Sequence, residues 1–218
     1  MISINLNPVI VMKSILLIIL SFIHMGSLCT QLMSNPLVYE GVSGVGKGKH
    51  VVFIASDHEY RGEETCPAIA RILAHRYGFK CTVLFGLDNE GYIKPGSSKI
   101  PGTEVVKGAD MLFFFIRFLA PDDKTMQPII DYLDRGGPVA GLRTTTHGFN
   151  GLKGKNKKYN YNSRDKSYDW GFGRQVNGET WRPRGGAGHY GSQHRVRPSQ
   201  VVVPGEKGHT RTHGVTGR

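Results

Sequence analysis

The chain has 218 residues, 39% of them hydrophobic and 21% charged, which suits one ordinary domain of roughly 100 to 200 residues and a targeting segment. Its net charge of +11 is concentrated late, because residues 1–150 carry +1 and residues 151–218 carry +10. Basic, glycine-rich stretches such as Lys153–Lys158 can follow phosphate backbones or anionic membranes, but solvated loops of an exported protein have the same composition. We therefore expect neither a second domain nor a nucleic-acid partner.

Residues 1–30 have the layout of a secretory signal peptide. Met12 and Lys13 precede the apolar run Ser14–Ile23, and small residues with Cys29 follow. This run is short of the roughly 20 residues that span a membrane, and Met12 is an alternative start because no positive charge lies before it. Leu28 stands where a lipoprotein would carry a small residue. We expect a soluble periplasmic or secreted product that leaves the membrane after signal cleavage.

The cysteines do not predict a disulfide. Cys29 would leave with the signal, so only Cys66 and Cys81 remain. They flank a predicted helix of about 15 residues, which at roughly 1.5 Å per residue separates them by about 20 Å. A disulfide needs Cα atoms within about 7 Å.

A polar, glycine-rich linker is expected over residues 31–48, before a domain covering residues 49–218. His50–Ala55 is apolar throughout, as in a buried parallel strand, and Glu63–Tyr77 has a helical period that Gly78 ends. Strands are predicted at Thr82–Phe85, Met111–Ile116 and Pro138–Leu142, a helix at Asp123–Arg135, and, after long loops from Gly151, a late strand at Gln200–Val203. This alternation indicates an α/β fold with a doubly wound parallel sheet. Ligands bind such sheets beyond the carboxyl ends of the strands.

The segment after the first strand is rich in titratable side chains. Glu59, Tyr60 and Arg61 are candidates for a ligand site there, with Glu59 also a candidate catalytic residue. Glu63 and Glu64 are explained more simply as charges that complement the dipole of the following helix.

The fourth strand leads into Gly141–His147, where this kind of fold often holds a nucleophile on a strand-to-helix turn. A cysteine amidotransferase would have its thiol at the place of Arg143, so that chemistry is excluded. Arg143 suits ligand recognition or an ion pair with Glu59 or Asp57. Thr144 is a ligand-binding candidate, although polar turn residues often bond local backbone instead. His147 is the second catalytic candidate, by proximity in sequence alone.

No histidines have the tight spacing of a strong metal motif. His147, Glu179 and His189 are the one set considered for a divalent metal, but we expect no cofactor. Trp181 and Glu179 are ligand-binding candidates, because aromatic faces beside polar groups commonly contact sugars, and Trp181 could equally be a core residue.

Several short motifs occur in the order found in the ThuA-like (trehalose-utilisation) family, which the chain resembles over nearly all of residues 50–218. They include Glu59-Tyr60-Arg61, Tyr77-Gly78-Phe79, Arg117-Phe118, Asp131-Tyr132-Leu133, Gly141-Leu142-Arg143-Thr144 with His147, and Gly178-Glu179-Thr180-Trp181. The resemblance implies a flavodoxin-like, class I glutamine-amidotransferase-like fold and an association with trehalose or keto-sugars. It supplies no established catalytic set. Where similar proteins continue into further strands this chain stops after His209–Val215, so a shortened C-terminus is expected.

Three functions follow. The first is an isomerase or hydrolase acting on a sugar or keto-sugar, with Glu59 or His147 as proton carrier and Arg117 and Arg143 as ligand clamps. The second is a non-catalytic carbohydrate-binding or interaction module. The third and weakest is polyanion binding through the basic tail.

Overall fold

The computed structural model describes residues 36–178 and Trp181. The expected signal peptide, Glu179, His189 and the expected strand at Gln200–Val203 lie outside the described residues. Among the helices of the described part, none is long and apolar enough to cross a lipid bilayer. The described elements, in chain order, are strands β1 (Leu37–Tyr39) and β2 (His50–Ser56), helix α2 (Gly62–Tyr77), strand β3 (Lys80–Phe85), the 3-10 helix η1 (Thr103–Gly108), strand β4 (Met111–Ile116), helix α3 (Asp123–Asp134), strand β5 (Val139–Gly141), the 3-10 helices η2 (Arg143–His147) and η3 (Gly154–Tyr159), and helix α4 (Gly171–Val176).

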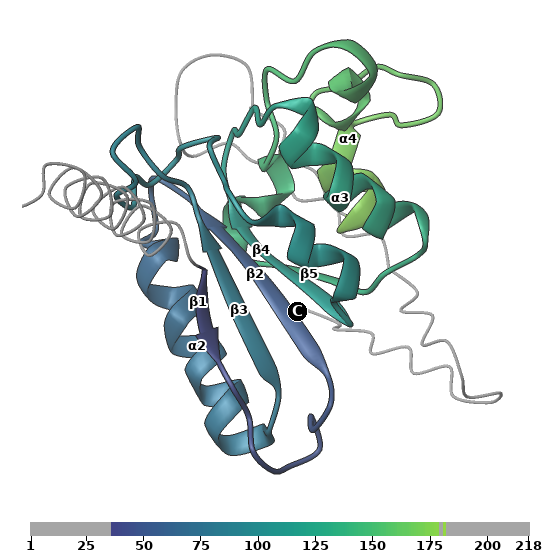
Figure 1. Ribbon diagram of the computed structural model, residues 1–218. Helices are drawn as coiled ribbons and strands as arrows, with labels where there is room; N and C mark the ends of the chain where they lie inside the picture. Colours follow the sequence, from purple (N-terminus) through teal and green to yellow (C-terminus); the bar gives the residue numbers. More distant parts are fainter. Residues whose placement is uncertain (1–35, 179–180, 182–218) are drawn as a thin grey trace, which may run out of the picture. The chain divides into compact units, whose positions relative to one another are not determined.

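The strands form one sheet in the order β1-β3-β2-β4-β5 (Figure 1). The pairs β2–β3, β2–β4 and β4–β5 are parallel, and β1 runs antiparallel to β3. The predicted α/β class with a mostly parallel sheet is therefore confirmed, and the order β3-β2-β4-β5 is compatible with a flavodoxin-like fold. From β2 the chain passes first to β3 on one side and then across to β4 on the other. The order thus reverses between β2 and β4.

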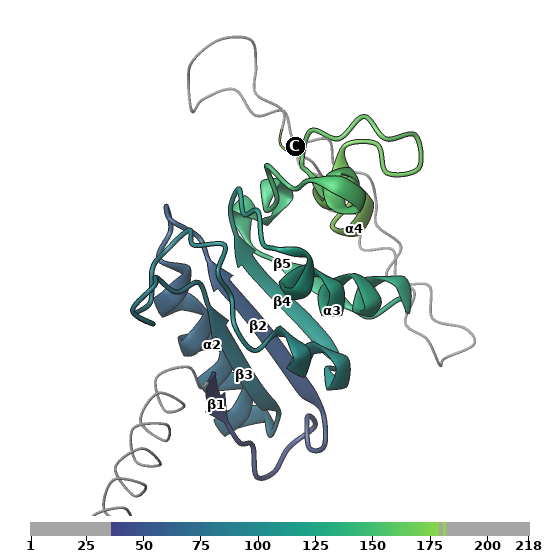
Figure 2. The same cartoon turned by 45° about the horizontal axis from the view of Figure 1, so that its top comes forward.

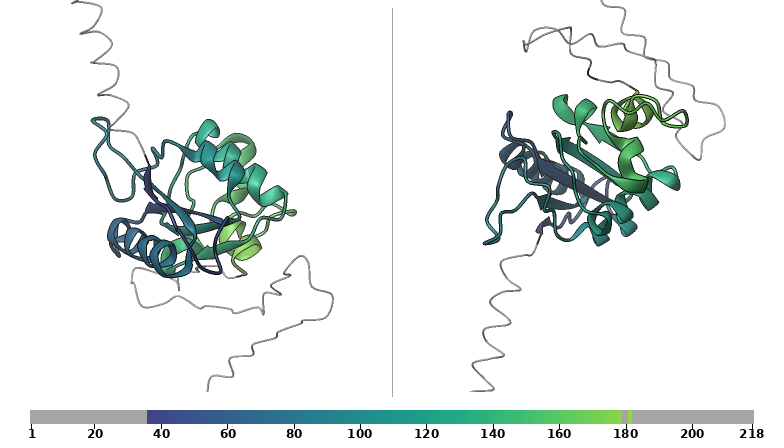
Figure 3. Two further views of the ribbon diagram at one scale, coloured as in Figure 1. Left: turned by 60° about the horizontal axis from the view of Figure 1, so that its bottom comes forward. Right: turned by 90° about the horizontal axis from the view of Figure 1, so that it is seen from above.

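Two apolar cores lie on opposite faces of the sheet, because successive strand residues point to opposite faces. On one face Phe53 of β2 packs with Ala70 of α2, and on the other Ile54 packs with Met126 of α3. All four side chains are at most 1% exposed. The views in Figure 2 and Figure 3 show α2 and α3 on either side of the sheet. Among the described residues, neither Cys66 of α2 nor Cys81 of β3 is in a disulfide. Both lie in the core between α2 and the sheet.

The six elements expected between residues 50 and 142 occur within two residues of their predicted bounds. Gly78 ends α2 as expected, with a left-handed φ of 79° and its N–H bonded to the carbonyl of Ala74. Strongly apolar or periodic segments flanked by a stop residue are therefore placed well by pattern alone.

The segment expected to be a linker differs from that expectation. Its residues 37–39 form β1, and its turn lies against the end of α2. Gly41 meets Gly78 so closely that a Cβ on Gly41 would lie 2.2 Å from the Gly78 carbonyl carbon. The described fold thus begins before Lys49. A strand of three residues is too short to show an alternation of apolar and polar residues in the sequence. A contact between two backbones does not depend on side chains, so it leaves no sequence pattern either.

The region after Gly151, expected to be long loops, also contains structure. It holds η3 and α4, and Phe172 of α4 is fully buried. The Phe172 ring lies edge-on to Phe114, 5.2 Å between centroids, and to Phe149, 5.0 Å. Phe172 thus joins α4 to β4 within the core on the α3 side of the sheet.

Candidate functional site

Residues with strained backbone conformations lie just beyond the carboxyl ends of neighbouring strands. In the described part of the chain, four residues other than glycine have positive φ. Three of them are Arg61 (55°) after β2, Phe118 (50°) after β4 and Arg143 (41°) after β5. Such residues cost about 1 to 3 kcal/mol each and concentrate at binding and catalytic sites. They mark the crevice that a sheet of this topology is expected to use.

Asp57 fixes the loop after β2. Its side chain is fully buried, and Oδ1 accepts hydrogen bonds from the backbone N–H groups of Glu59 (2.8 Å) and Tyr60 (2.5 Å). Its Oδ2 accepts the Thr144 hydroxyl at 2.5 Å, which ties this loop to η2. Thr144, a predicted ligand-binding residue, is thus buried and bonded within the fold. The sequence signal for Asp57 is an Asp placed directly after a buried strand, where it can bond the following N–H groups.

Two predicted site residues, Glu59 and Arg117, form an ion pair across the point where the strand order reverses. Arg117 Nε lies 3.0 Å from Glu59 Oε2, and the two side chains are only 14% and 30% exposed. Arg117 Nη1 lies 2.7 Å from Nε2 of His58, which the sequence did not single out. The Arg117 guanidinium, which comes from the loop after β4, is therefore held by two side chains of the loop after β2.

Arg143, with a φ of 41°, is the first residue of η2 and follows β5 closely, at the place where α/β folds of this kind often hold a nucleophile. Its guanidinium carbon lies 3.9 Å from the centroid of the Tyr60 ring, a cation–π contact. This contact brings two predicted ligand-binding residues together. Arg61 instead forms an ion pair with Glu64 in the first turn of α2, and its side chain is 73% exposed.

Four rings form what we call the aromatic cluster: Phe118, His147, Tyr161 and Trp181. The His147 ring lies 4.9 Å from Phe118 and 5.0 Å from Trp181 between centroids. Tyr161 lies 5.3 Å from Phe118 and 5.6 Å from Trp181. His147 is buried, with Nδ1 3.2 Å from the Thr146 hydroxyl. The structure thus joins the predicted His147 and Trp181 to Tyr161, which carried no motif signal.

The threonine hydroxyls beside this cluster are engaged. Thr145 Oγ1 donates to the backbone oxygen of Phe114 at 2.9 Å, and Thr146 Oγ1 donates to that of Arg143 at 3.3 Å. Together with the Thr144–Asp57 bond, these contacts give all three hydroxyls a place in the local fold. The Thr144 and Thr145 hydroxyls are thus bonded to oxygen acceptors, whereas the Thr146 hydroxyl also lies within hydrogen-bond distance of the His147 imidazole.

No metal centre is evident in the described residues, which contain no group of three or more His, Cys, Asp or Glu side chains placed to hold an ion. Of the set considered for a divalent metal, only His147 is described. Among the described residues, these strand ends bring together the Glu59 carboxylate, the guanidinium groups of Arg117 and Arg143, and the rings of the aromatic cluster.

Comparison with known proteins adds no identity to this picture. No protein-family model, curated protein or solved structure matches the chain.

Proposed function

We propose that this chain is a carbohydrate-recognising protein of the ThuA-like kind, with its sugar site in the crevice beyond β2, β4 and β5. The observation that carries the proposal is the adjacency of Arg117 and Phe118. Arg117 holds Glu59, while Phe118 belongs to the aromatic cluster, and the Arg117 guanidinium carbon lies 4.8 Å from the Phe118 ring centroid. A charged pair and an aromatic surface thus meet at one point.

A sugar offers both of the surfaces that such a site complements. Its C–H groups form apolar patches that pack on aromatic faces, while its hydroxyls need donors and acceptors at fixed positions. Tyr161 and Trp181, each only partly buried, provide rings. Arg117 and Arg143 provide planar, permanently charged donors that suit hydroxyl, keto and carboxylate oxygens.

The reaction that fits these residues is proton transfer on a sugar or keto-sugar, of isomerase or hydrolase type. Glu59 or His147 would carry the proton, and Arg117 and Arg143 would hold the substrate and stabilise negative charge on its oxygen. A covalent route is disfavoured because Arg143 occupies the turn where a nucleophile would stand. Of the nearby threonine hydroxyls, those of Thr144 and Thr145 already donate to protein oxygens.

A specific observation also favours the alternative, a non-catalytic carbohydrate-binding or interaction module. Glu59 is paired with Arg117, and His147 is buried against two rings of the aromatic cluster. Both candidate proton carriers are therefore engaged by neighbours, as in a site built to bind.

The proposal extends to fold family and location. The β3-β2-β4-β5 order and the strained turn at Arg143 support a class I glutamine-amidotransferase-like fold that has lost its thiol. The apolar run Ser14–Ile23 supports export to the periplasm or medium. Cell fractionation followed by N-terminal sequencing would test export and signal cleavage. Protein found only in the cytoplasm would contradict export, and an intact Met1 or Met12 would contradict cleavage.

Thermal unfolding of the full chain, recorded against disaccharides, keto-sugars and uronates, tests the main proposal, because a ligand that binds only the folded state raises the midpoint. A shift confined to one sugar class, followed by product formation, supports the enzyme. The same shift without product supports the module. A cooperative transition that no sugar moves contradicts both.

Two tyrosine variants locate the binding site. Tyr161→Ala removes one ring of the aromatic cluster and should abolish the sugar-induced shift. Tyr77→Ala is the matched control, because Tyr77 is exposed at the end of α2, away from the strand ends that form the crevice. Equal loss in both variants would mean that the sugar binds elsewhere.

A further inference from the structure

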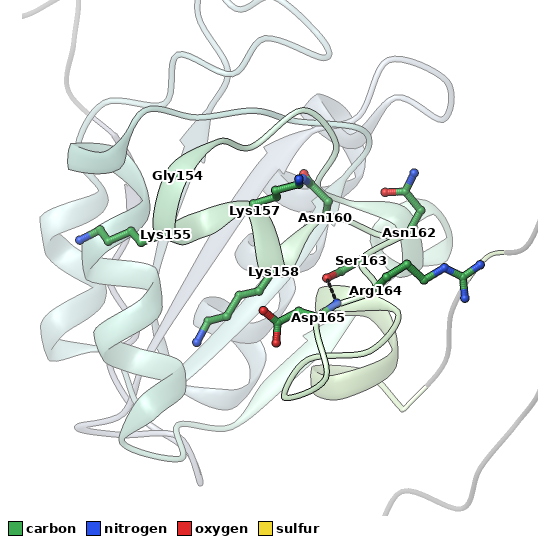
Figure 4. Close-up of a pocket in the computed structure, with 9 residues that line it drawn as sticks. All are labelled: Gly154, Lys155, Lys157, Lys158, Asn160, Asn162, Ser163, Arg164 and Asp165. Atoms are coloured by element: carbon green, nitrogen blue, oxygen red, sulfur yellow. Dashed lines mark hydrogen bonds between the residues drawn. The ribbon is translucent and has the colours of Figure 1, made fainter.

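A second candidate site lies outside the crevice, where η3 and the loop after it surround a cavity of about 710 Å³ (Figure 4). Sites for small molecules fall in the range of about 300 to 1,000 Å³. The cavity is therefore of a size for a small molecule rather than for a length of polymer.

The lining of this cavity is strongly basic. Four lining side chains are cationic and one is acidic: Lys155, Lys157, Lys158 and Arg164 against Asp165. Among the described residues, none of the four basic side chains is in an ion pair with a carboxylate. Asp165 Oδ1 accepts instead from Ser167, at 2.9 Å from the backbone N and 2.6 Å from the hydroxyl. The Ser167 bonds and, less strongly, the charge of Lys158 lower the pKa of the Asp165 carboxyl, and Lys155 Nζ donates to Gln127 Oε1 at 2.7 Å. Four cations against one carboxylate still leave the lining with a net positive charge.

Neutral contacts hold the charged groups in position. Arg164 stacks on Trp170, with its guanidinium carbon 4.2 Å from the ring centroid. Lys158 Nζ lies 5.1 Å from the Tyr159 ring centroid and 5.3 Å from that of Tyr168. Such contacts lower the entropy lost when a ligand binds, while leaving the N–H groups free to donate.

We propose that this cavity binds an oxyanion, the phosphate or sulfate ester group of a small molecule. Arg164 supplies a planar fork of donors that matches such a group, while the charged ends of Lys157 and Lys158, which point in other directions (Figure 4), raise the positive potential around the cavity. The exposed amide of Asn162 adds a neutral donor at the rim. The site is independent of the crevice, so either can exist without the other.

Calorimetric titration of the full chain at low salt tests the proposal with four probes: inorganic phosphate, inorganic sulfate, glucose 6-phosphate and glucose. We expect phosphate or sulfate to bind and glucose 6-phosphate to bind more tightly, whereas glucose does not bind at this site. If glucose 6-phosphate bound no more tightly than inorganic phosphate or sulfate, the site would be one for free anions, and the part of the proposal that concerns an ester would fail. Failure of all three anions to bind would overturn the proposal.

Three variants connect the affinity to the cavity. Arg164→Ala should weaken glucose 6-phosphate binding about tenfold, the effect of losing about 1.4 kcal/mol of a charged hydrogen bond, and Lys157→Ala, which only lowers the positive potential, should weaken it less. Asp165→Asn removes the one opposing charge and should strengthen binding. Lys47→Ala, in an exposed turn before β2, is the control with equal loss of charge.

The control variant distinguishes binding at the cavity from general attraction of anions by the net positive charge of the protein. If Lys47→Ala weakens binding as much as the cavity variants, only net charge matters and the proposal fails. It also fails if duplex DNA or vesicles containing anionic lipid bind through Lys157 and Arg164 while small esters do not. Unchanged unfolding midpoints would show that the variants are folded.

Discussion

Asp57 and Thr144, 87 residues apart in the sequence, are joined by a hydrogen bond of 2.5 Å between a carboxylate and a hydroxyl that are both buried. This bond connects the loop that carries Glu59 and Tyr60 to the turn that carries Arg143 and His147. The two loops that supply most of the candidate site are therefore positioned by a contact that need not touch a ligand.

Thr144→Val removes the hydroxyl while keeping the shape, and leaves Asp57 with one donor fewer in a buried place. We expect the free energy of unfolding to fall by about 1 to 3 kcal/mol, the cost of a buried polar group that loses its partner. Urea denaturation of the full chain measures this. Thr144→Ser keeps the hydroxyl and should remain within about 1 kcal/mol of the native chain; equal losses in the two variants would contradict the role given to the bond.

Glu59→Gln and His147→Phe distinguish the two candidate proton carriers once a sugar substrate is found. Each change keeps the size of the side chain and removes its titratable group. Loss of the true proton carrier should lower kcat by about 100-fold or more, while the sugar-induced rise in unfolding midpoint persists. Turnover retained in both variants would exclude both residues, and turnover absent from the native chain would leave the binding module.

The fold between residues 50 and 142 could be predicted because its signals are local. The apolar run at β2, the helical period of α2 and the glycine at position 78 each act within a few residues. Two elements, β1 and α4, were not predicted because they lack such local signals. β1 is held by pairing with β3, and α4 by the burial of Phe172, and both depend on partners far away in the sequence.

For the candidate site, too, one part could be predicted from the sequence and another could not. Its location followed from the expected carboxyl ends of the strands, and Glu59, Arg117, His147 and Trp181 do lie there in contact with other candidates. Their partners could not be predicted, because pairing across loops is decided by tertiary packing. Tyr161 had no motif, and the hydrogen bond from the Thr144 hydroxyl goes to Asp57, a residue 87 positions away in the sequence.

Gly78→Ala tests the contact between the N-terminal segment and α2. The residue has φ of 79°, and a Cβ there would lie 2.4 Å from the carbonyl oxygen of Ser43. We expect a loss of more than about 1 kcal/mol in the free energy of unfolding, since a left-handed backbone and a backbone clash both oppose alanine. Gly108→Ala is the control, because a Cβ there meets nothing within 4 Å, and it should change stability by less than about 0.5 kcal/mol. A similar loss in both variants would mean that the close approach of Ser43 has no energetic weight.

The buried thiols predict a loss of stability in alkaline solution. Burial, followed by the nearby charges of Glu63 and Asp57, raises the pKa of the Cys66 thiol to about 12, and burial raises that of Cys81 to about 11. Near pH 9 to 10 the unfolded chain has released these protons, since a free thiol has a pKa of about 8.5, while the folded chain still holds them. The folded state then binds more protons than the unfolded state, so stability falls as pH rises, by about 1.4 kcal/mol per pH unit for each thiol.

Urea denaturation at pH 8, 9 and 10 measures that slope. Cys66→Ala should make it shallower, by a difference that grows with pH towards about 1.4 kcal/mol per pH unit near pH 10. Comparing slopes removes the loss of stability caused by the small cavity that the change creates, because that loss does not depend on pH. At pH 8 the native thiols should also react slowly with a disulfide reagent, because neither is exposed and a neutral thiol is a poor nucleophile. An unchanged slope in Cys66→Ala, or rapid modification of Cys66 in the folded chain, would show that this thiol is not held neutral beneath α2.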